Sequence, residues 1–124
     1  MLSNAKYIQL LSSLITLLSL YPNCKLFVSI LLSSSATLKI EPHLQGEVFS
    51  KCKLLWHSIL SDGDTLLRNE CIKNMVYFLK NTTFKDGLAA FVPEAMKPQI
   101  VNYINNGDNA QSMVKQLFKI YISN

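Results

Sequence analysis

Cysteine and histidine side chains are the first residues of this chain that could perform chemistry. The sequence contains three cysteines, Cys24, Cys52 and Cys71, and two histidines, His43 and His57. The cysteines are odd in number and form no C-x-x-C pair, and neither histidine has a cysteine or carboxylate at the spacing of a metal ligand. We therefore expect no metal site, and we interpret each cysteine as a small buried hydrophobe in a reducing compartment.

Nucleophilic catalysis needs a base within hydrogen-bond reach of the nucleophile. Cys52 and His57 would lie on one helix, where a separation of five residues makes the two side chains diverge by more than a turn. Asp62 and Asp64 are close together, but a helix-capping turn explains both carboxylates. The four glycines are isolated, so no phosphate-binding loop is present. The sequence predicts no catalytic residue and no cofactor.

The composition leaves the chain short of surface charge. Of its 124 residues, 49% are hydrophobic and 16% are charged, whereas about 25% are charged in a typical soluble domain. Either the chain buries extra apolar surface against a partner or against neighbouring repeats, or its N-terminal third lies in a membrane. Disorder is not expected, because burial of so much apolar surface offsets the entropy cost of ordering.

The net charge is +4, and lysine carries nearly all of the positive charge. Arg68 is the single arginine, and the lysines are scattered along the chain. Recognition of phosphate groups by planar, bidentate donors favours arginine. The charge pattern therefore argues against a dedicated nucleic-acid ligand and leaves attraction to an acidic partner open.

Residues 7–21 form an apolar run between Lys6 and Pro22 that looks like a signal peptide or a membrane anchor. The run is shorter than the roughly 20 residues that a membrane span needs, and Tyr21, Pro22 and Asn23 make a poor cleavage site. Its polar residues recur at three- and four-residue steps, which places them on one helical stripe. They are Gln9, Ser12, Ser13, Thr16 and Ser19. We favour a core helix that is buried on most sides and has a narrow polar strip.

Periodicity and turn signals divide the chain into six or seven helices. We expect them at 4–20, from Asn23, from His43, from a cap at Asp64 or Thr65 to about 80, and at 84–88, 98–104 and 108–121. Residues 36–42 are expected to form a loop or a ragged helix end. Because the turns are short, neighbouring helices should be antiparallel. The predicted fold class is all-α, in a single domain over residues 1–124.

Apolar stripes predict which face of each helix is buried. In the second helix the stripe is Leu26, Phe27, Ile30 and Leu31. In the third helix it is Leu44, Val48, Cys52, Leu55, Trp56 and Ile59. In the fourth helix it is Leu67, Cys71, Ile72, Met75, Phe78 and Leu79. We expect these side chains to form the core.

The segment 43–79 resembles one unit of a HEAT repeat. The pattern of an acidic turn followed by an aliphatic-arginine pair is carried by Asp62, Asp64, Leu67, Arg68, Cys71, Ile72 and Met75. The flanking turns lack this signature, so an armadillo-like or irregular α-solenoid is an equal alternative. The resemblance implies antiparallel helical hairpins that stack and stabilise one another, and it assigns Asp62, Asp64 and Arg68 to contacts between repeats. It also implies that the chain is a segment or short isoform of a larger α-solenoid.

We expect a non-catalytic scaffold for protein–protein interaction, in a larger assembly of the nuclear, chromosome-maintenance type. The chain would then be intracellular, cytoplasmic or nuclear, with a protein partner and no membrane. The candidate interaction surface consists of rim lysines and aromatic anchors: Lys51, Lys53, Lys73, Lys80, Tyr103, Phe118 and Tyr121. The alternative is a small membrane-associated or secreted helical protein in which residues 7–21 are the anchor or signal.

Overall fold

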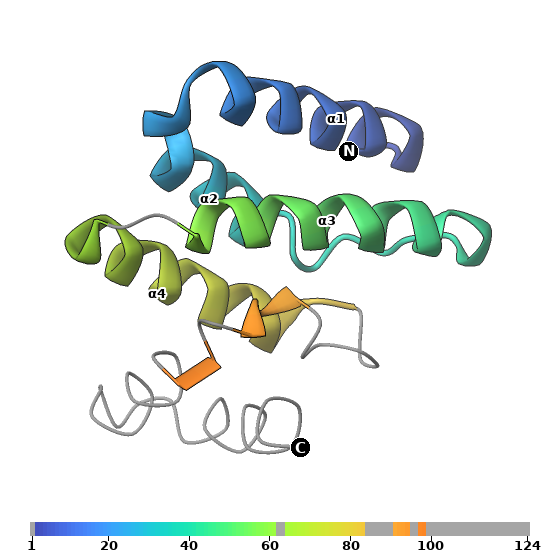
Figure 1. Ribbon diagram of the computed structural model, residues 1–124. Helices are drawn as coiled ribbons and strands as arrows, with labels where there is room; N and C mark the ends of the chain where they lie inside the picture. The colour runs from blue at the N-terminus through green and yellow to red at the C-terminus, as the bar shows by residue number, and fades with distance from the viewer. Residues whose placement is uncertain (1, 62–63, 84–90, 95–96, 99–124) are drawn as a thin grey trace.

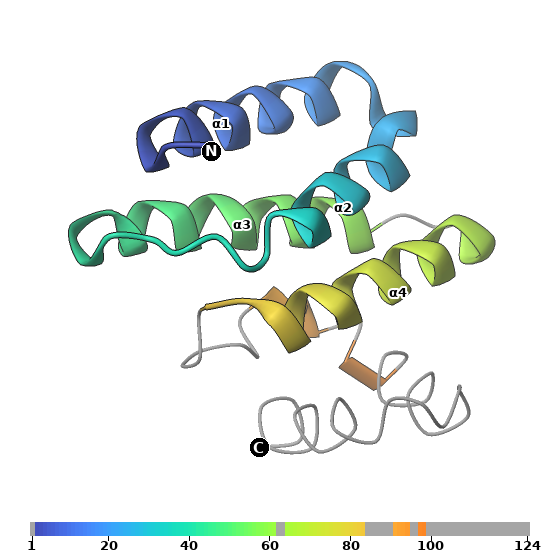
Figure 2. The ribbon, with the colours of Figure 1, turned by 180° about the vertical axis from the view of Figure 1, so that it is seen from behind.

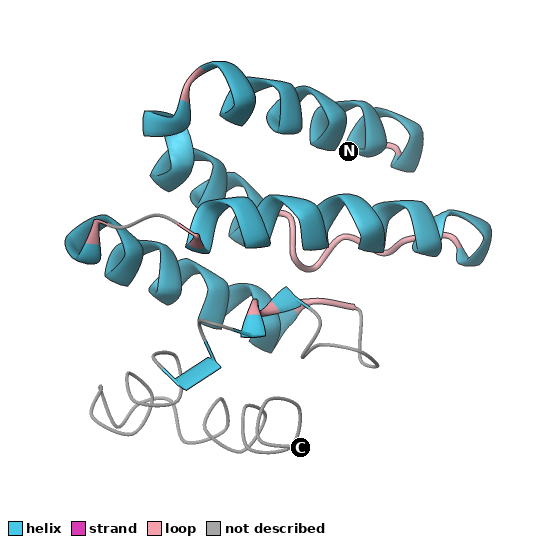
Figure 3. Cartoon of the chain, viewed as in Figure 1, coloured by secondary structure: helices cyan, strands magenta, loops and turns pink. Residues whose placement is uncertain are grey.

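The computed structural model of the chain describes residues 2–61, 64–83, 91–94 and 97–98. These residues form helices, turns and loops, with no strand among them (Figure 3). The α-helices are α1 (Asn4–Leu20), α2 (Lys25–Ser34), α3 (Gln45–Leu60) and α4 (Thr65–Asn81), and 3-10 helices cover Pro22–Cys24 and Pro42–Leu44. The expected all-α class is confirmed for this part of the chain. The helices predicted at 84–88, 98–104 and 108–121 lie outside it, apart from Pro98.

Successive helices run antiparallel, so α1 and α2 pair as the first helical hairpin and α3 and α4 pair as the second (Figure 1). Seen from either side, α1 and α3 run in one direction and α2 and α4 run in the other (Figures 1 and 2). Packing joins the two pairs, because α1 lies against α3 and α2 lies against α4. The connection between α2 and α3 continues onward from the end of α2 and runs beside α3 to the point where α3 begins (Figure 2).

α1 begins and ends where the sequence predicts. The Ser3 side chain caps it by accepting a hydrogen bond of 3.2 Å from the backbone N–H of Lys6. One stripe is buried, made of Tyr7, Leu11, Leu14 and Leu18. α1 packs mainly on α3, and Gln9, Ser13 and Thr16 of the predicted polar strip are exposed. Burial of its other sides is less complete than predicted, because many of the remaining side chains are only half-buried and Leu20 is exposed. None of the described helices is both long enough and apolar enough to cross a membrane.

α2 buries a different face from the one that its apolar stripe predicts. Phe27 and Ile30 are 56% and 47% exposed, whereas Val28 and Leu32 are buried. The second helix also begins later than predicted, because Asn23 lies inside the 3-10 helix and α2 begins two residues after it. The other two residues of the predicted stripe, Leu26 and Leu31, are half-buried and pack against the core. Hydrophobicity alone therefore identified only part of the inward-facing side of this ten-residue helix.

The reason lies in two small side chains, Ser29 and Ser33, which are buried on the inner face of α2. Each hydroxyl donates to the carbonyl three residues earlier, at 2.7 Å and 2.9 Å, so burial leaves no donor unsatisfied. The Asn74 side chain of α4 donates to Ser29 Oγ at 2.9 Å. Small side chains allow close approach of two backbones, and the interhelical hydrogen bond fixes how α2 and α4 meet.

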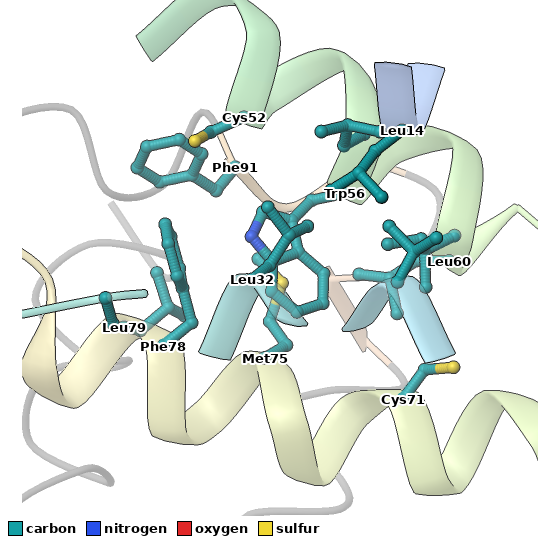
Figure 4. Close-up of a cluster of buried hydrophobic side chains, with 14 of the residues drawn as sticks. Leu14, Leu32, Cys52, Trp56, Leu60, Cys71, Met75, Phe78, Leu79 and Phe91 are labelled. Atoms are coloured by element: carbon teal, nitrogen blue, oxygen red, sulfur yellow. The ribbon is translucent and has the colours of Figure 1, made fainter. Parts of the chain in front are cut away.

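The core between α3 and α4 follows the predicted stripes. All predicted positions of these stripes are buried except Leu44 and Leu67, which are half-buried. Figure 4 shows the Trp56 ring among Leu32, Met75 and Phe78. The rings of Trp56 and Phe78 lie 5.4 Å apart, and Phe91 meets Phe78 edge to face at 5.2 Å. Such aromatic pairs stabilise by about 0.5–1.5 kcal/mol beyond burial, so residue 91 joins the segment after α4 to the core.

Replacement of Ser29 by leucine should separate α2 from α4. Overpacking of this kind lowers the free energy of unfolding by about 1–3 kcal/mol, and the change also removes the acceptor of Asn74. The matched control is Ser34→Leu on the exposed face of the same helix, which should change stability by less than about 0.5 kcal/mol. Urea denaturation measures both, and equal effects at the two serines would contradict the close contact.

Candidate functional site

The cysteines are all free thiols, and the predicted burial holds for two of them. Cys52 and Cys71 are buried in the core, whereas Cys24 is half-buried in the 3-10 helix between α1 and α2. Cys24 therefore departs from its predicted buried position because it lies in a connection at the surface. Within the described residues, no three side chains of the types that hold metal ions are grouped together.

One buried polar cluster joins α1, the end of α2 and α3. The Tyr7 hydroxyl lies 2.9 Å from Ser35 Oγ and 4.0 Å from Cys52 Sγ. Because Ser35 donates its own proton to the Leu32 carbonyl at 3.0 Å, Tyr7 is the donor to Ser35. Burial raises the pKa of Tyr7 above its ordinary value and raises the pKa of Cys52 to about 12. At neutral pH both groups are uncharged, so the cluster connects three elements and supplies no nucleophile.

The raised pKa values of Cys52 and Tyr7 predict a loss of stability at alkaline pH. In the unfolded chain Cys52 ionises near 9.0, whereas the folded thiol stays neutral up to about 12. Because the folded pKa is the higher one, the stabilisation is complete below about pH 9 and is lost as pH rises toward 12. The loss should be on the order of 1 kcal/mol per pH unit, measured by urea unfolding at a series of pH values. Cys52→Ala should flatten this dependence, and an unchanged slope would refute the assignment.

The predicted rim lysines lie as two pairs on the second hairpin. On α3, Lys51 is half-buried and Lys53 is exposed, and both precede the exposed Leu54. On α4, Lys73 and Lys80 are exposed, and Lys73 Nζ lies 3.1 Å from Glu70 Oε1. Ion pairs this exposed contribute little to stability.

The predicted aromatic anchors Tyr103, Phe118 and Tyr121 lie outside the described residues. In the described part, the exposed aromatic side chains are instead Tyr21, Phe27 and Tyr77. The sequence analysis placed Phe27 on an apolar stripe and Tyr21 at the end of the apolar run 7–21, and it missed the exposure of both. It did not single out Tyr77. The signal for Tyr77 was its position on the side of α4 opposite the apolar stripe.

The repeat-signature residues have distinct structural roles where they are described. Asp64 caps α4, because its Oδ1 accepts a hydrogen bond of 3.1 Å from the backbone N–H of Leu67. The Asp64 carbonyl accepts another, of 2.9 Å, from the N–H of Arg68. The Arg68 side chain is half-buried. Asp62 lies outside the described residues.

Removal of the cap should be measurable. Asp64→Ala leaves the first-turn N–H of Leu67 without its acceptor, so the free energy of unfolding should fall by about 1 kcal/mol. Asn69→Ala, at an exposed position later in α4, is the matched control and should be neutral or slightly stabilising. Thermal denaturation of the two variants tests this prediction. An Asp64→Ala variant as stable as the wild type would show that the Asp64 cap does not stabilise α4.

Two apolar grooves lie on the described surface. The first, about 200 Å³, separates α1 from α3 and is lined by Ile15, Leu18, Ser19, Leu54, Leu55 and Ser58. We call it the α1–α3 groove. The second, about 340 Å³, is lined by Leu2, Leu10, Leu31, Ser34, Ser35, Thr37 and Leu38, and we call it the α1–α2 groove. Neither groove has a charged or nucleophilic lining other than serine and threonine hydroxyls, so each is suited to bind apolar side chains.

The chain was compared with protein-family models, with curated proteins and with solved structures, and none of the three comparisons gives a match. A function can therefore be inferred only from the geometry of the grooves and from the surface charge.

Proposed function

We propose that the chain is a non-catalytic, intracellular module that binds another protein, built from stacked helical hairpins of the HEAT or armadillo type. The observation that supports this proposal most strongly is the α1–α3 groove, an apolar depression between two helices of net positive charge. The occupant that we propose is an acidic segment of the partner, which places an apolar side chain in the groove and carboxylates at its rim.

The pairing of helices supports the repeat architecture. Each helix packs on the equivalent helix of the other hairpin, α1 on α3 and α2 on α4. Equivalent helices also run in the same direction (Figures 1 and 2). This is the arrangement expected when two helix–turn–helix units stack with a small rotation between them, so that each hides its apolar face against the next. Larger arrays of this kind are used as binding scaffolds, and assembly into a larger, nuclear complex remains part of the proposal.

The charges around the α1–α3 groove support an acidic partner. Leu54 is 56% exposed and lines the groove. Lys51 lies one turn before Leu54 on the same side of α3, whereas Lys53 lies on another side of that helix. α1 contributes Lys6 and no acidic residue, and α3 contributes a single acidic residue, Glu47. The two helices that form the groove are therefore net positive, as is the whole chain at +4. Positive rim charges raise the association rate of an acidic segment and select its orientation.

The partner segment can be identified by replacing Leu54 with the photo-crosslinking residue p-benzoylphenylalanine in cells. Mass spectrometry of the crosslinked peptide should yield an acidic sequence that contains a large apolar residue. The same crosslinker at Asn69 on α4 is the control position and should not capture that peptide. Capture of a basic peptide, or of the same peptide from both positions, would contradict binding in the groove.

Charge reversal then tests the rim with purified components. Lys51→Glu should raise the Kd for the identified peptide by about tenfold, because a favourable interaction on the groove side of α3 becomes repulsive. The matched control is Lys53→Glu, which makes the same charge change on another side of the same helix. Isothermal titration calorimetry measures the Kd of both variants. An equal rise in Kd for the two variants would show that the charge acts only by non-specific attraction.

A further inference from the structure

The α1–α3 groove changes in character along its length. Its middle is apolar, and the last residue that each helix contributes to the lining is a serine, Ser19 on α1 and Ser58 on α3. Because α1 and α3 run in the same direction (Figure 1), both serines border the same end of the groove. Lys51 lies one turn before Leu54 on the same side of α3, toward the opposite end. The groove therefore offers a positive charge, an apolar middle and two hydroxyls, in that order.

The two serine hydroxyls differ in the hydrogen bonds that they can still make. Ser19 Oγ donates to the Ile15 carbonyl at 3.3 Å, so its lone pairs remain available as acceptors. Within the part of the chain that the structure describes, no hydrogen bond uses Ser58 Oγ, since the one from Ser61 Oγ, at 2.9 Å, goes to the Ser58 carbonyl. Ser58 Oγ can therefore both donate and accept.

An occupant of the groove has to provide for these hydroxyls. The Ser58 side chain is half-buried, so an occupant that fills the groove covers it further and removes water from it. A covered hydroxyl that loses water and gains no partner opposes binding. The occupant that fits best therefore combines an apolar body with a polar group at one tip.

We propose that the acidic segment bound in the α1–α3 groove is anchored there by a tyrosine side chain. This inference rests on the function proposed above and identifies the anchor residue of the partner. The aromatic ring packs on the apolar middle of the groove, and the phenol hydroxyl lies at the serine end. A phenol hydroxyl both donates and accepts, so it can donate to Ser19 Oγ and accept from Ser58 Oγ. A carboxylate beside the tyrosine in the same segment faces Lys51.

Other anchor residues leave the serine end of the groove without a partner. Leucine, isoleucine, methionine and phenylalanine have no hydrogen-bonding group to place there, apart from the weakly accepting methionine sulfur. Tryptophan has an indole N–H that donates and does not accept, so the proton of Ser58 Oγ would find no acceptor. Tyrosine also suits an interface because one end of its side chain is apolar and the other is polar.

Three synthetic pentapeptides test the anchor on the full chain. Each has two glutamates on either side of a central residue, which is tyrosine, phenylalanine or tryptophan, and NMR chemical-shift titration measures each Kd. The tyrosine peptide should bind about five- to tenfold more tightly than the phenylalanine peptide, as expected for one or two net hydrogen bonds. Binding of the phenylalanine or tryptophan peptide that is equal to or tighter than that of the tyrosine peptide would overturn the proposal.

A pair of serine substitutions connects this preference to the groove. Ser19→Ala combined with Ser58→Ala should weaken binding of the tyrosine peptide to the level of the phenylalanine peptide, whose own Kd should not change. The matched control is Ser13→Ala combined with Ser34→Ala, since both serines are exposed and neither lines this groove. The control should keep the full preference, and circular dichroism verifies the helical content of both variants. A preference for tyrosine that survives loss of Ser19 and Ser58 would refute the anchor.

The outcomes separate the tyrosine anchor from the function on which it rests. Equal Kd values for the three peptides, all raised by Lys51→Glu, would refute the anchor and leave an acidic partner in the groove. Capture at Leu54 of an acidic peptide whose apolar residue is not tyrosine would have the same meaning. Absence of binding by all three peptides would count against both proposals.

Discussion

The contact between α2 and α4 through buried serines determines how the rest of the molecule is arranged. Ser29 and Ser33 allow the two helices to approach closely, and Asn74 adds a hydrogen bond of 2.9 Å across the contact. A leucine-rich face would have kept the helices further apart, because its side chains need more space. Once the serine face is turned inward, Phe27 and Ile30 have to lie outside. The same choice that fixes the packing of the two hairpins therefore also places apolar side chains on the surface of α2.

Charge divides the described structure into two parts with different physical properties. Apart from Lys6, the first hairpin presents apolar and uncharged polar groups, whereas the second presents lysines and most of the acidic side chains. Two groups that could perform chemistry, the Cys52 thiol and the Tyr7 hydroxyl, are withdrawn into the core, and burial keeps both of them neutral at physiological pH. The two surfaces therefore suit partners of different charge, and each surface can be altered by substitution without disturbing the core.

Prediction from sequence was most accurate where one physical signal acted alone. The bounds of α1, the buried stripe of α3 and the cap at Asp64 all follow from local pattern and local hydrogen bonding. The buried face of α2 did not follow from local pattern. Ser29 and Ser33 face inward in place of Phe27 and Ile30 because α2 packs closely on α4, and that contact is not visible in the sequence of α2. The two grooves were likewise out of reach, since each is formed by residues from different helices. Phe91 was missed as well, because its burial depends on contacts with distant Phe49 and Phe78.

The side chain of Asn4 has a consequence for the motions of the molecule. Its amide donates to the Lys39 carbonyl at 3.1 Å, and its oxygen accepts from the N–H of Glu41 at 2.8 Å. Asn4 thus fastens the start of α1 to the chain that enters α3, at the end of α1 opposite the 3-10 helix Pro22–Cys24. Opening of the first hairpin must break both of these bonds as well as the apolar contacts behind them. We therefore expect the two hairpins to open as one cooperative unit, rather than fraying from the N-terminus.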